Sequence, residues 1–130
     1  MIKKMEQILV ETGELFTTAS GISMLPCIRP KRDMIHLVTP NQGVKKHDVI
    51  LYKRKNGNYI LHRVMKTKPD GYVLCGDNQW VLEWGINDEQ VLGVLKGFYR
   101  GERYVDCEKI VCIIYIWLYG VFRLQCENGF

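Results

Sequence analysis

The chain has 130 residues, of which 47% are hydrophobic and 25% are charged, and its net charge is +4 at pH 7. This length and composition are typical of one soluble globular domain that buries its own core. There is no dense run of Lys and Arg, which argues against a nucleic-acid-binding protein. The five cysteines form no CxxC pair, so neither a zinc site nor a disulfide framework is indicated. We therefore expect neither a metal nor another cofactor.

The first part of the chain, residues 1–17, is predicted to be helical. Apolar side chains recur at helical spacing, which predicts an amphipathic helix over about residues 2–16. Gly13 weakens this prediction, because glycine is a poor helix former. Glu6, Glu11 and Glu14 interrupt any apolar run, so we expect no secretory signal peptide here.

Residues 18–106 carry short apolar runs separated by turn residues. Asn56-Gly57 and Pro69-Asp70-Gly71 are strong turn signals. The runs predict strands over residues 34–38, 48–53, 59–66, 72–75, 91–99 and 103–105. We therefore predict a mainly β protein, with an antiparallel sheet that forms a small barrel-like structure.

The last part, residues 107–130, contains the almost uninterrupted apolar stretch Ile110–Phe122. A helix that spans a bilayer needs about 20 apolar residues, so this stretch is too short to cross a membrane. It could lie on the membrane surface as a peripheral anchor, with Tyr115, Trp117 and Tyr119 as interfacial aromatic residues. It could equally be a C-terminal helix that covers the core, or a buried strand. The sequence leaves these alternatives open.

The first candidate catalytic residue lies in the segment Gly21-Ile22-Ser23-Met24-Leu25-Pro26. Glycine and proline at these positions exclude a regular helix or a central strand. A turn of this kind can present the Ser23 hydroxyl as a nucleophile, although a plain surface turn has the same composition.

The three histidines are the candidates for a general base that activates this hydroxyl. His62 lies on a predicted strand, with Ile60 and Val64 on the same face. An imidazole there is either a core residue or a general base for a serine. Of the other two, His36 lacks a motif and His47 follows two lysines in a predicted loop.

Acidic and thiol groups supply further candidates. The turn Gly76-Asp77-Asn78 offers Asp77 as a carboxylate that orients a histidine, and Glu83 is a second acidic candidate. Cys27 and Cys75 are weak candidates for a thiol nucleophile, because no recognisable motif places a histidine beside them.

Four segments together resemble the type I signal peptidases and the SOS-repressor self-cleaving peptidases of the same superfamily. The segments appear in the order seen in that superfamily: Gly21-x-Ser23-Met24-x-Pro26, Asp48-Val49-Ile50, Tyr59-x-x-His62-Arg63-Val64 and Gly76-Asp77-Asn78. They run from Gly21 to about Asn78. His62-Arg63 in place of a Lys-Arg pair resembles the branch that uses a Ser/His dyad.

The resemblance implies a serine endopeptidase that cleaves a peptide or preprotein bound in extended form. Ser23 would be the nucleophile, His62 the general base and Asp77 the acid that orients it. Gly21, Met24 and Pro26 would contact the substrate. The backbone N–H of Ser23 would hold the oxyanion.

Several residues depart from the family pattern. Cys27 and Arg32 replace a threonine and a glycine, and Gly21 stands where some relatives have a serine that donates to the oxyanion. The N-terminal transmembrane anchor of membrane signal peptidases is not seen, which favours a cytoplasmic or peripherally membrane-associated enzyme. The alternatives are a catalytically inactive peptide-binding module and a self-cleaving regulatory domain.

Overall fold

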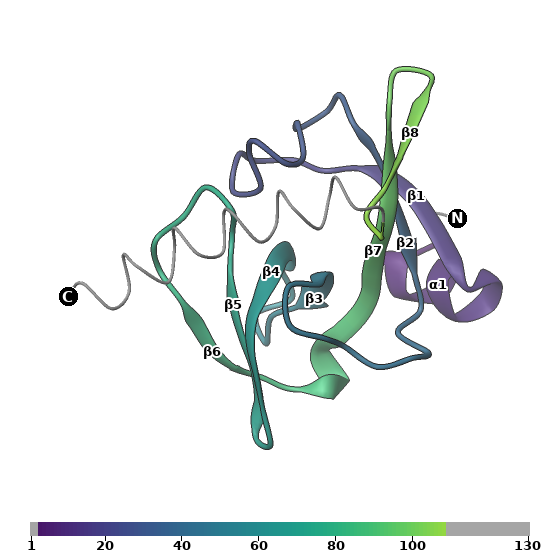
Figure 1. The fold of residues 1–130 in the computed structure, drawn as a ribbon. Helices are drawn as coiled ribbons and strands as arrows, with labels where there is room; N and C mark the ends of the chain where they lie inside the picture. Colours follow the sequence, from purple (N-terminus) through teal and green to yellow (C-terminus); the bar gives the residue numbers. More distant parts are fainter. Residues whose placement is uncertain (1–2, 109–130) are drawn as a thin grey trace.

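The computed structural model describes residues 3–108 and consists of one antiparallel sheet with one short helix (Figure 1). The helix is α1 (Met5–Thr12), and a single 3-10 turn, η1 (Asp88–Gln90), precedes β7. The strands are β1 (Glu14–Thr18), β2 (Met34–Val38), β3 (Val49–Lys53), β4 (Tyr59–Lys68), β5 (Gly71–Cys75), β6 (Glu83–Ile86), β7 (Val91–Arg100) and β8 (Arg103–Asp106). The stretch Ile110–Phe122 lies outside the described residues.

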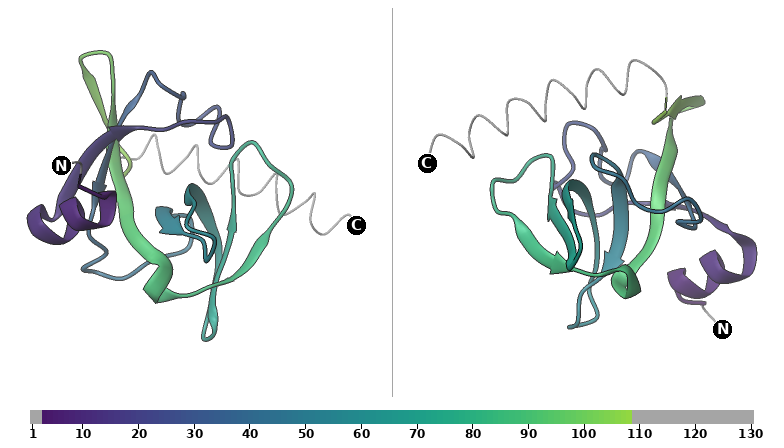
Figure 2. Two further views of the ribbon diagram at one scale, coloured as in Figure 1. Left: turned by 180° about the vertical axis from the view of Figure 1, so that it is seen from behind. Right: turned by 60° about the horizontal axis from the view of Figure 1, so that its bottom comes forward.

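The sheet is curled but open. Its strand order is β1-β2-β7-β3-β4-β5-β6, and β8 pairs with β7 beside this path. Within residues 3–108 no strand pairing joins β1 to β6, so the predicted barrel does not close. Figure 2 shows how the long β7 bends between β2 and β3. Bulges in both pairings of β7 give this bend, because an extra residue on one strand increases its local twist.

The N-terminal helix is shorter than predicted. It ends at Thr12, and Gly13 adopts the left-handed conformation with φ of 82° while its N–H donates to the Leu9 carbonyl. Glycine favours this helix-ending geometry because it has no Cβ. Leu15 and Phe16, which fit the helical spacing, instead belong to β1, where Leu15 is buried and Phe16 is exposed.

The predicted β-hairpins form, with one difference in turn geometry. Only Gly57 in the Asn56-Gly57 pair has a positive φ, of 94°. The turn is closed by hydrogen bonds from Arg54 N to Asn58 O and from Gly57 N to Arg54 O. It is therefore wider than the two-residue turn that Asn-Gly predicts, and it pairs Lys53 with Tyr59.

Two apolar clusters fill the fold, one against each face of the β3–β4 hairpin. The first contains Leu51, and Leu61 packs against it; the second contains Ile50, Tyr52 and Val64. Neighbouring residues of a strand face opposite sides, so each strand contributes to both clusters. Of residues 3–108, four with polar or charged side chains are buried: Asp33, His62, Arg63 and Asp77.

Helix α1 is tied to the sheet by Glu6. Its carboxylate accepts hydrogen bonds from the Tyr59 hydroxyl at 2.6 Å and from Lys53 Nζ at 3.1 Å. The Tyr59 hydrogen bond, aided by Lys53, lowers the pKa of Glu6 to about 2. Because this pKa lies below the ordinary value of 4.5, the contact stabilises the fold above pH 4.5 and is lost as the pH falls toward 2.

We expect Glu6→Gln to lower the free energy of unfolding by about 1 kcal/mol at pH 7, a value reduced by the partial exposure of the site. Near pH 2 the variant and the wild type should be equally stable. Urea unfolding at the two pH values measures this. Glu11→Gln on the same helix is the control, and an equal loss in both variants at pH 7 would contradict the assignment.

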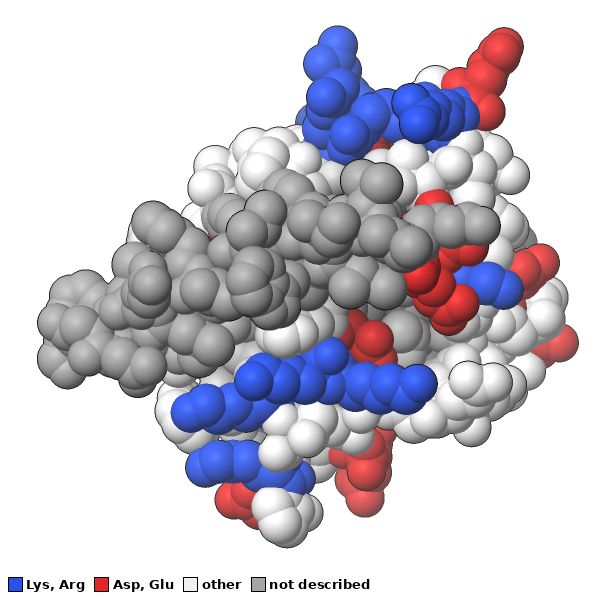
Figure 3. All heavy atoms as spheres, viewed as in Figure 1, with Lys and Arg blue, Asp and Glu red and all other residues white. Residues whose placement is uncertain are grey.

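The surface carries both signs of charge. Figure 3 shows basic side chains gathered at the top of one face, over the β7–β8 hairpin and beside it, and in a band lower down. Acidic side chains lie among them. In the part of the chain that the structure describes, no helix is long and apolar enough to span a bilayer.

Candidate functional site

Ser23 lies in a tight turn that is anchored by its neighbours. Gly21 has a φ of 80°, and the Leu25–Pro26 peptide bond is cis. The side chains of Met24 and Ile28 are buried in the first apolar cluster, while Ser23 is half-buried. Burial of the two apolar side chains fixes the turn and leaves the serine at the surface of the core.

The loop that follows this turn is clamped by a buried carboxylate. Asp33 accepts hydrogen bonds from the backbone N–H of Arg29 and from the guanidinium of Arg100, which also donates to the Cys27 carbonyl. Burial opposes ionisation of Asp33, but the Arg100 and Arg29 hydrogen bonds outweigh it and lower its pKa. Asp33 therefore holds the chain after Ser23 against β7.

The segment Gly76-Asp77-Asn78 packs directly on the serine turn. The backbone N–H of Asn78 donates to the Ser23 carbonyl at 2.7 Å, and the Asn78 side chain donates to the Ile22 carbonyl. A Cβ at position 76 would lie 2.6 Å from the Ser23 carbonyl oxygen and 3.0 Å from its Cβ. Glycine is therefore required at position 76 by close approach of the two segments.

His62 is placed by β4 and is held by a hydrogen-bonded chain. Its Nδ1 lies 3.2 Å from the hydroxyl of Tyr52 on β3, and this hydroxyl lies 2.6 Å from Glu83 Oε1. Arg54 binds the same carboxylate through Nε and Nη2, at 2.9–3.2 Å. His62 and Tyr52 are both buried.

Ionisation fixes the direction of these hydrogen bonds. Burial opposes ionisation of Glu83, but hydrogen bonds from Arg54 and Tyr52 outweigh it and lower its pKa. Burial, followed by the bond to Glu83, raises the pKa of Tyr52 far above its usual value. Tyr52 thus stays protonated and donates its only proton to Glu83, so its oxygen accepts from His62 Nδ1–H. When the His62 ring is neutral, its single proton is then on Nδ1, so Nε2 carries no proton and can act as a base.

Asp77, which was predicted to orient His62, binds Arg63, the next residue on β4. Its two carboxylate oxygens accept from Nε and Nη2 of Arg63, each at 2.7 Å, and both side chains are buried. Burial opposes the charge on Arg63, but the Asp77 hydrogen bonds raise its pKa. Arg63 also donates to the His47 carbonyl. In this arrangement Asp77 binds Arg63, and Glu83 is the carboxylate linked to His62 through Tyr52.

Ser23 and His62 line one small hollow of about 180 Å³. Gly21 and Met24, which were predicted to contact substrate, line it as well, and Pro26 does not. The remaining lining residues are Ala19, Ser20, Ile28, Arg54, Tyr59, Ile60, Leu61 and Gln79. A hydroxyl and an imidazole from distant segments thus open into the same space.

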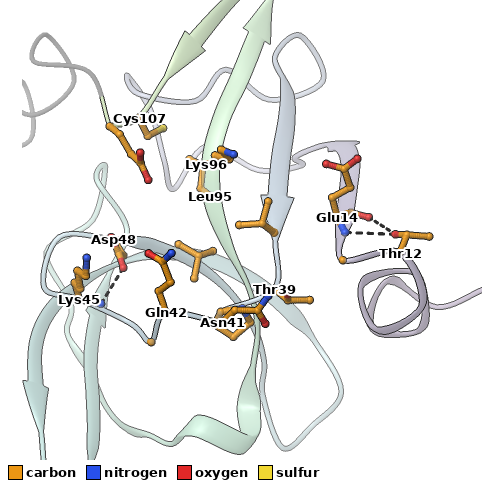
Figure 4. A pocket seen from close by; sticks show the side chains of 16 residues that line it. Thr12, Glu14, Thr39, Asn41, Gln42, Lys45, Asp48, Leu95, Lys96 and Cys107 are labelled. Carbon is orange, nitrogen blue, oxygen red and sulfur yellow. Dashed lines mark hydrogen bonds between the residues drawn. The ribbon is translucent and has the colours of Figure 1, made fainter.

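A larger hollow, of about 460 Å³, lies between the α1–β1 junction, the loop before β3 and β7 (Figure 4). Asp48 lines it and accepts a hydrogen bond from the Lys45 N–H at 2.8 Å. Burial raises the pKa of Asp48. No serine or histidine is among the residues that line this hollow, so it offers no Ser/His pair.

The competing histidines lie in other environments. His36 is bonded to Glu14 and Tyr104 and stacks on Phe16, with ring centroids 4.2 Å apart. His47 has a positive φ, and burial lowers its pKa. Neither residue lines the hollow that contains Ser23.

The described cysteines and acidic groups do not form a metal site. Cys27, Cys75 and Cys107 are thiols, and the Cys75 Sγ donates to the Gln79 carbonyl. Among residues 3–108, no three His, Cys, Asp or Glu side chains are grouped so that they could hold a metal ion.

Comparisons with protein-family models, with curated proteins and with solved structures found no match.

Proposed function

We propose that the protein is a serine endopeptidase of the signal-peptidase-like type that cleaves an extended peptide with a Ser23/His62 dyad. The observation that carries this proposal is the shared hollow, into which Ser23 opens from one turn and His62 from β4. The hydrogen-bonded chain behind His62 adds support, because it selects the tautomer that a general base requires.

In the proposed acylation step, Ser23 Oγ attacks the carbonyl carbon of the scissile peptide bond while its proton passes to His62 Nε2. The C–N bond of the resulting tetrahedral intermediate then breaks, and the imidazolium returns the proton to the leaving amine. Water repeats the sequence on the acyl-enzyme and releases the acid. During both steps the Tyr52 oxygen accepts the hydrogen bond of Nδ1–H, and Glu83 accepts the Tyr52 O–H, so the negative carboxylate behind Tyr52 helps to stabilise the positive charge on the ring.

The oxyanion of these intermediates needs hydrogen-bond donors. The backbone N–H of Ser23 is the donor that we assign. Gly21 has no side chain to add a second one, and Ser20, three residues before Ser23 in the sequence, also lines the hollow. One such donor contributes about 2.7–4 kcal/mol in acyl-transfer enzymes, so the identity of a second donor matters.

A docking edge for an extended peptide lies beside the dyad. On one side, β4 pairs with β3 from Tyr59 to Arg63. On the other side, β5 pairs with β4 only from Arg63 onward. The second edge of residues 59–62 therefore has no strand partner in the described part of the chain. Main-chain groups at such an edge bind a peptide by strand addition.

The proposal is tested with a peptidyl phosphonate, which reacts covalently with an activated serine. We expect one adduct, located at Ser23 by tryptic mass mapping, and none in Ser23→Ala. Labelling should also fail in His62→Gln, because the base is absent. If the wild type binds peptides but forms no adduct, the protein is an inactive binding module and the proposal is wrong.

Gly76→Ala should impair this site more than the fold. The new methyl group cannot be accommodated without moving the Ser23 backbone, and misplacement of a reacting group by about 1 Å can cost 10²-fold in rate. We expect kcat/KM for peptide hydrolysis to fall about 10²-fold. Gly93→Ala on β7, which meets the Val38 carbonyl oxygen at 3.2 Å, is the control and should keep its activity. Equal activity in both variants would contradict the close-packing argument.

A further inference from the structure

A second hollow adjoins the one that contains Ser23. It has a volume of about 490 Å³, which lies within the range of about 300–1,000 Å³ typical of ligand sites. Its lining consists of Arg54, His62, Gln79, Trp80, Val81, Leu82 and Glu83. Three of these residues, Arg54, His62 and Gln79, also line the Ser23 hollow. The two spaces therefore meet at the histidine of the proposed dyad.

The rim of this second hollow exposes large apolar side chains. Trp80 is 63% exposed and Val81 is 80% exposed. Arg54 and Glu83, two charged residues of the lining, form a salt bridge in which Arg54 Nη2 lies 2.9 Å from Glu83 Oε1. The apolar part of the lining is the segment Trp80-Val81-Leu82.

The two hollows meet at the open edge of β4. Leu61 and His62, which face opposite sides of the strand, both line the Ser23 hollow, whereas of these two only His62 lines the second hollow. Met24 and Ile28, which line the Ser23 hollow, lie in the first apolar cluster with Leu61. His62 alternates with Leu61 and shares its face with Tyr52, whose hydroxyl contacts Glu83 of the second hollow. A peptide added to the open edge of residues 59–62 would direct successive side chains to these two faces in turn.

We propose that the Trp80-Val81-Leu82 hollow binds a large apolar side chain of the substrate peptide, at a position next to the residue that occupies the Ser23 hollow. This inference rests on the proposed peptidase function. The hollow is continuous with the dyad through His62, and Arg54 and Glu83 in its lining are paired with each other, so its apolar segment matches a side chain such as Leu, Met or Phe. A lipid surface is the competing occupant of exposed tryptophan, and the test separates the two.

The substrate preference is measured by digesting a peptide library derived from a bacterial proteome and reading the cleavage sites by mass spectrometry. We expect Leu, Met, Phe or Trp to be enriched at one position beside the residue held near Ser23. Two synthetic peptides that differ only there, Leu against Ser, then give kcat/KM values. An apolar pocket discriminates by about 10- to 200-fold between side chains that differ by one methylene group. Leu and Ser differ by more than this, so we expect a Leu-to-Ser ratio of kcat/KM of at least 10.

Variants of the rim identify the hollow. Trp80→Ser and Val81→Ser should each reduce the Leu-to-Ser ratio several-fold. Trp84→Ser is the matched control, because Trp84 is 54% exposed but does not line the hollow. The ratio should not change in this control. An unchanged ratio in the Trp80 and Val81 variants, or a wild-type ratio near 1, overturns the proposal.

The same peptides, bound without turnover, separate this inference from the peptidase proposal. Their affinity for Ser23→Ala is measured by fluorescence anisotropy with labelled peptides. An apolar preference in binding with no cleavage by the wild type retains the subsite and rejects the enzyme. No preference in either assay rejects the subsite. The wild type and Trp80→Ser are also sedimented with phosphatidylserine-containing vesicles. If Trp80→Ser no longer sediments but keeps the Leu-to-Ser ratio of the wild type, the exposed apolar segment binds lipid and the subsite is rejected.

Discussion

Ser23→Ala is expected to lower kcat/KM for peptide hydrolysis by about 10⁴- to 10⁶-fold, because a dyad that has lost its nucleophile retains only binding and oxyanion stabilisation. The fold should be unaffected. Ser23 is half-buried, and its turn is held by the side chains of Met24 and Ile28 and by the Asn78 bond to its carbonyl. Peptide hydrolysis followed by mass spectrometry, together with urea unfolding of both proteins, measures the two effects separately.

His62→Gln gives the companion result. The amide can still bond to Tyr52 but cannot accept and return a proton, so the loss in kcat/KM should approach that of Ser23→Ala. The double variant should be little worse than either single one, since residues that act as a unit are non-additive. Activity that survives in Ser23→Ala and disappears in a cysteine variant would instead identify a thiol enzyme, and additive losses would show that the two groups do not act together.

Much of the sheet could be predicted because turn residues delimit the strands. The Asn56-Gly57 and Pro69-Asp70-Gly71 turns place β4 and β5, and the Met34–Val38 strand forms over the predicted residues. The end of α1 was mispredicted because Leu15 and Phe16 fit both a helical spacing and the alternation of β1. The strand β6 was missed, since Glu83-Trp84-Gly85-Ile86 has a charge and a glycine instead of an apolar run.

The site was predictable only where a motif or a strand pattern marked it. The Ser23 turn and the face of His62 follow from glycine, proline and alternation. The role of Tyr52 depends on the register of the β3–β4 hairpin, which pairs Ile50 with His62 and Tyr52 with Ile60. The wider turn at Gly57 sets this register, and the Asn-Gly pair alone predicts another turn. The carboxylate that is linked to His62 depends on how the chain after β5, which carries Asp77 and Glu83, packs against β3 and β4. The local sequence does not encode this packing.

The carboxylates can be distinguished by two matched substitutions, of which Asp77→Asn is the first. It removes one half of a buried ion pair and leaves the Arg63 guanidinium buried without its anion. Breaking such a pair costs about 3–5 kcal/mol, so we expect a loss of this order in the free energy of unfolding. Urea unfolding measures it. Activity per folded molecule, assayed at a temperature where the variant remains folded, should fall less than the activity of Glu83→Gln.

Glu83→Gln makes the same chemical change on the other carboxylate. It should lower the activity more than Asp77→Asn does, and the free energy of unfolding less. Tyr52 then loses an ionised acceptor, the tautomer of His62 is less firmly fixed and the imidazolium is less stabilised. We expect kcat/KM to fall about 10²-fold, less than the ~10⁴-fold seen when a carboxylate bonded directly to a catalytic histidine is changed to an amide. Tyr52→Phe should match it, because both variants break the same chain. If Asp77→Asn instead removes activity from fully folded protein while Glu83→Gln does not, then Asp77 orients the histidine and the chain through Tyr52 only supports the fold.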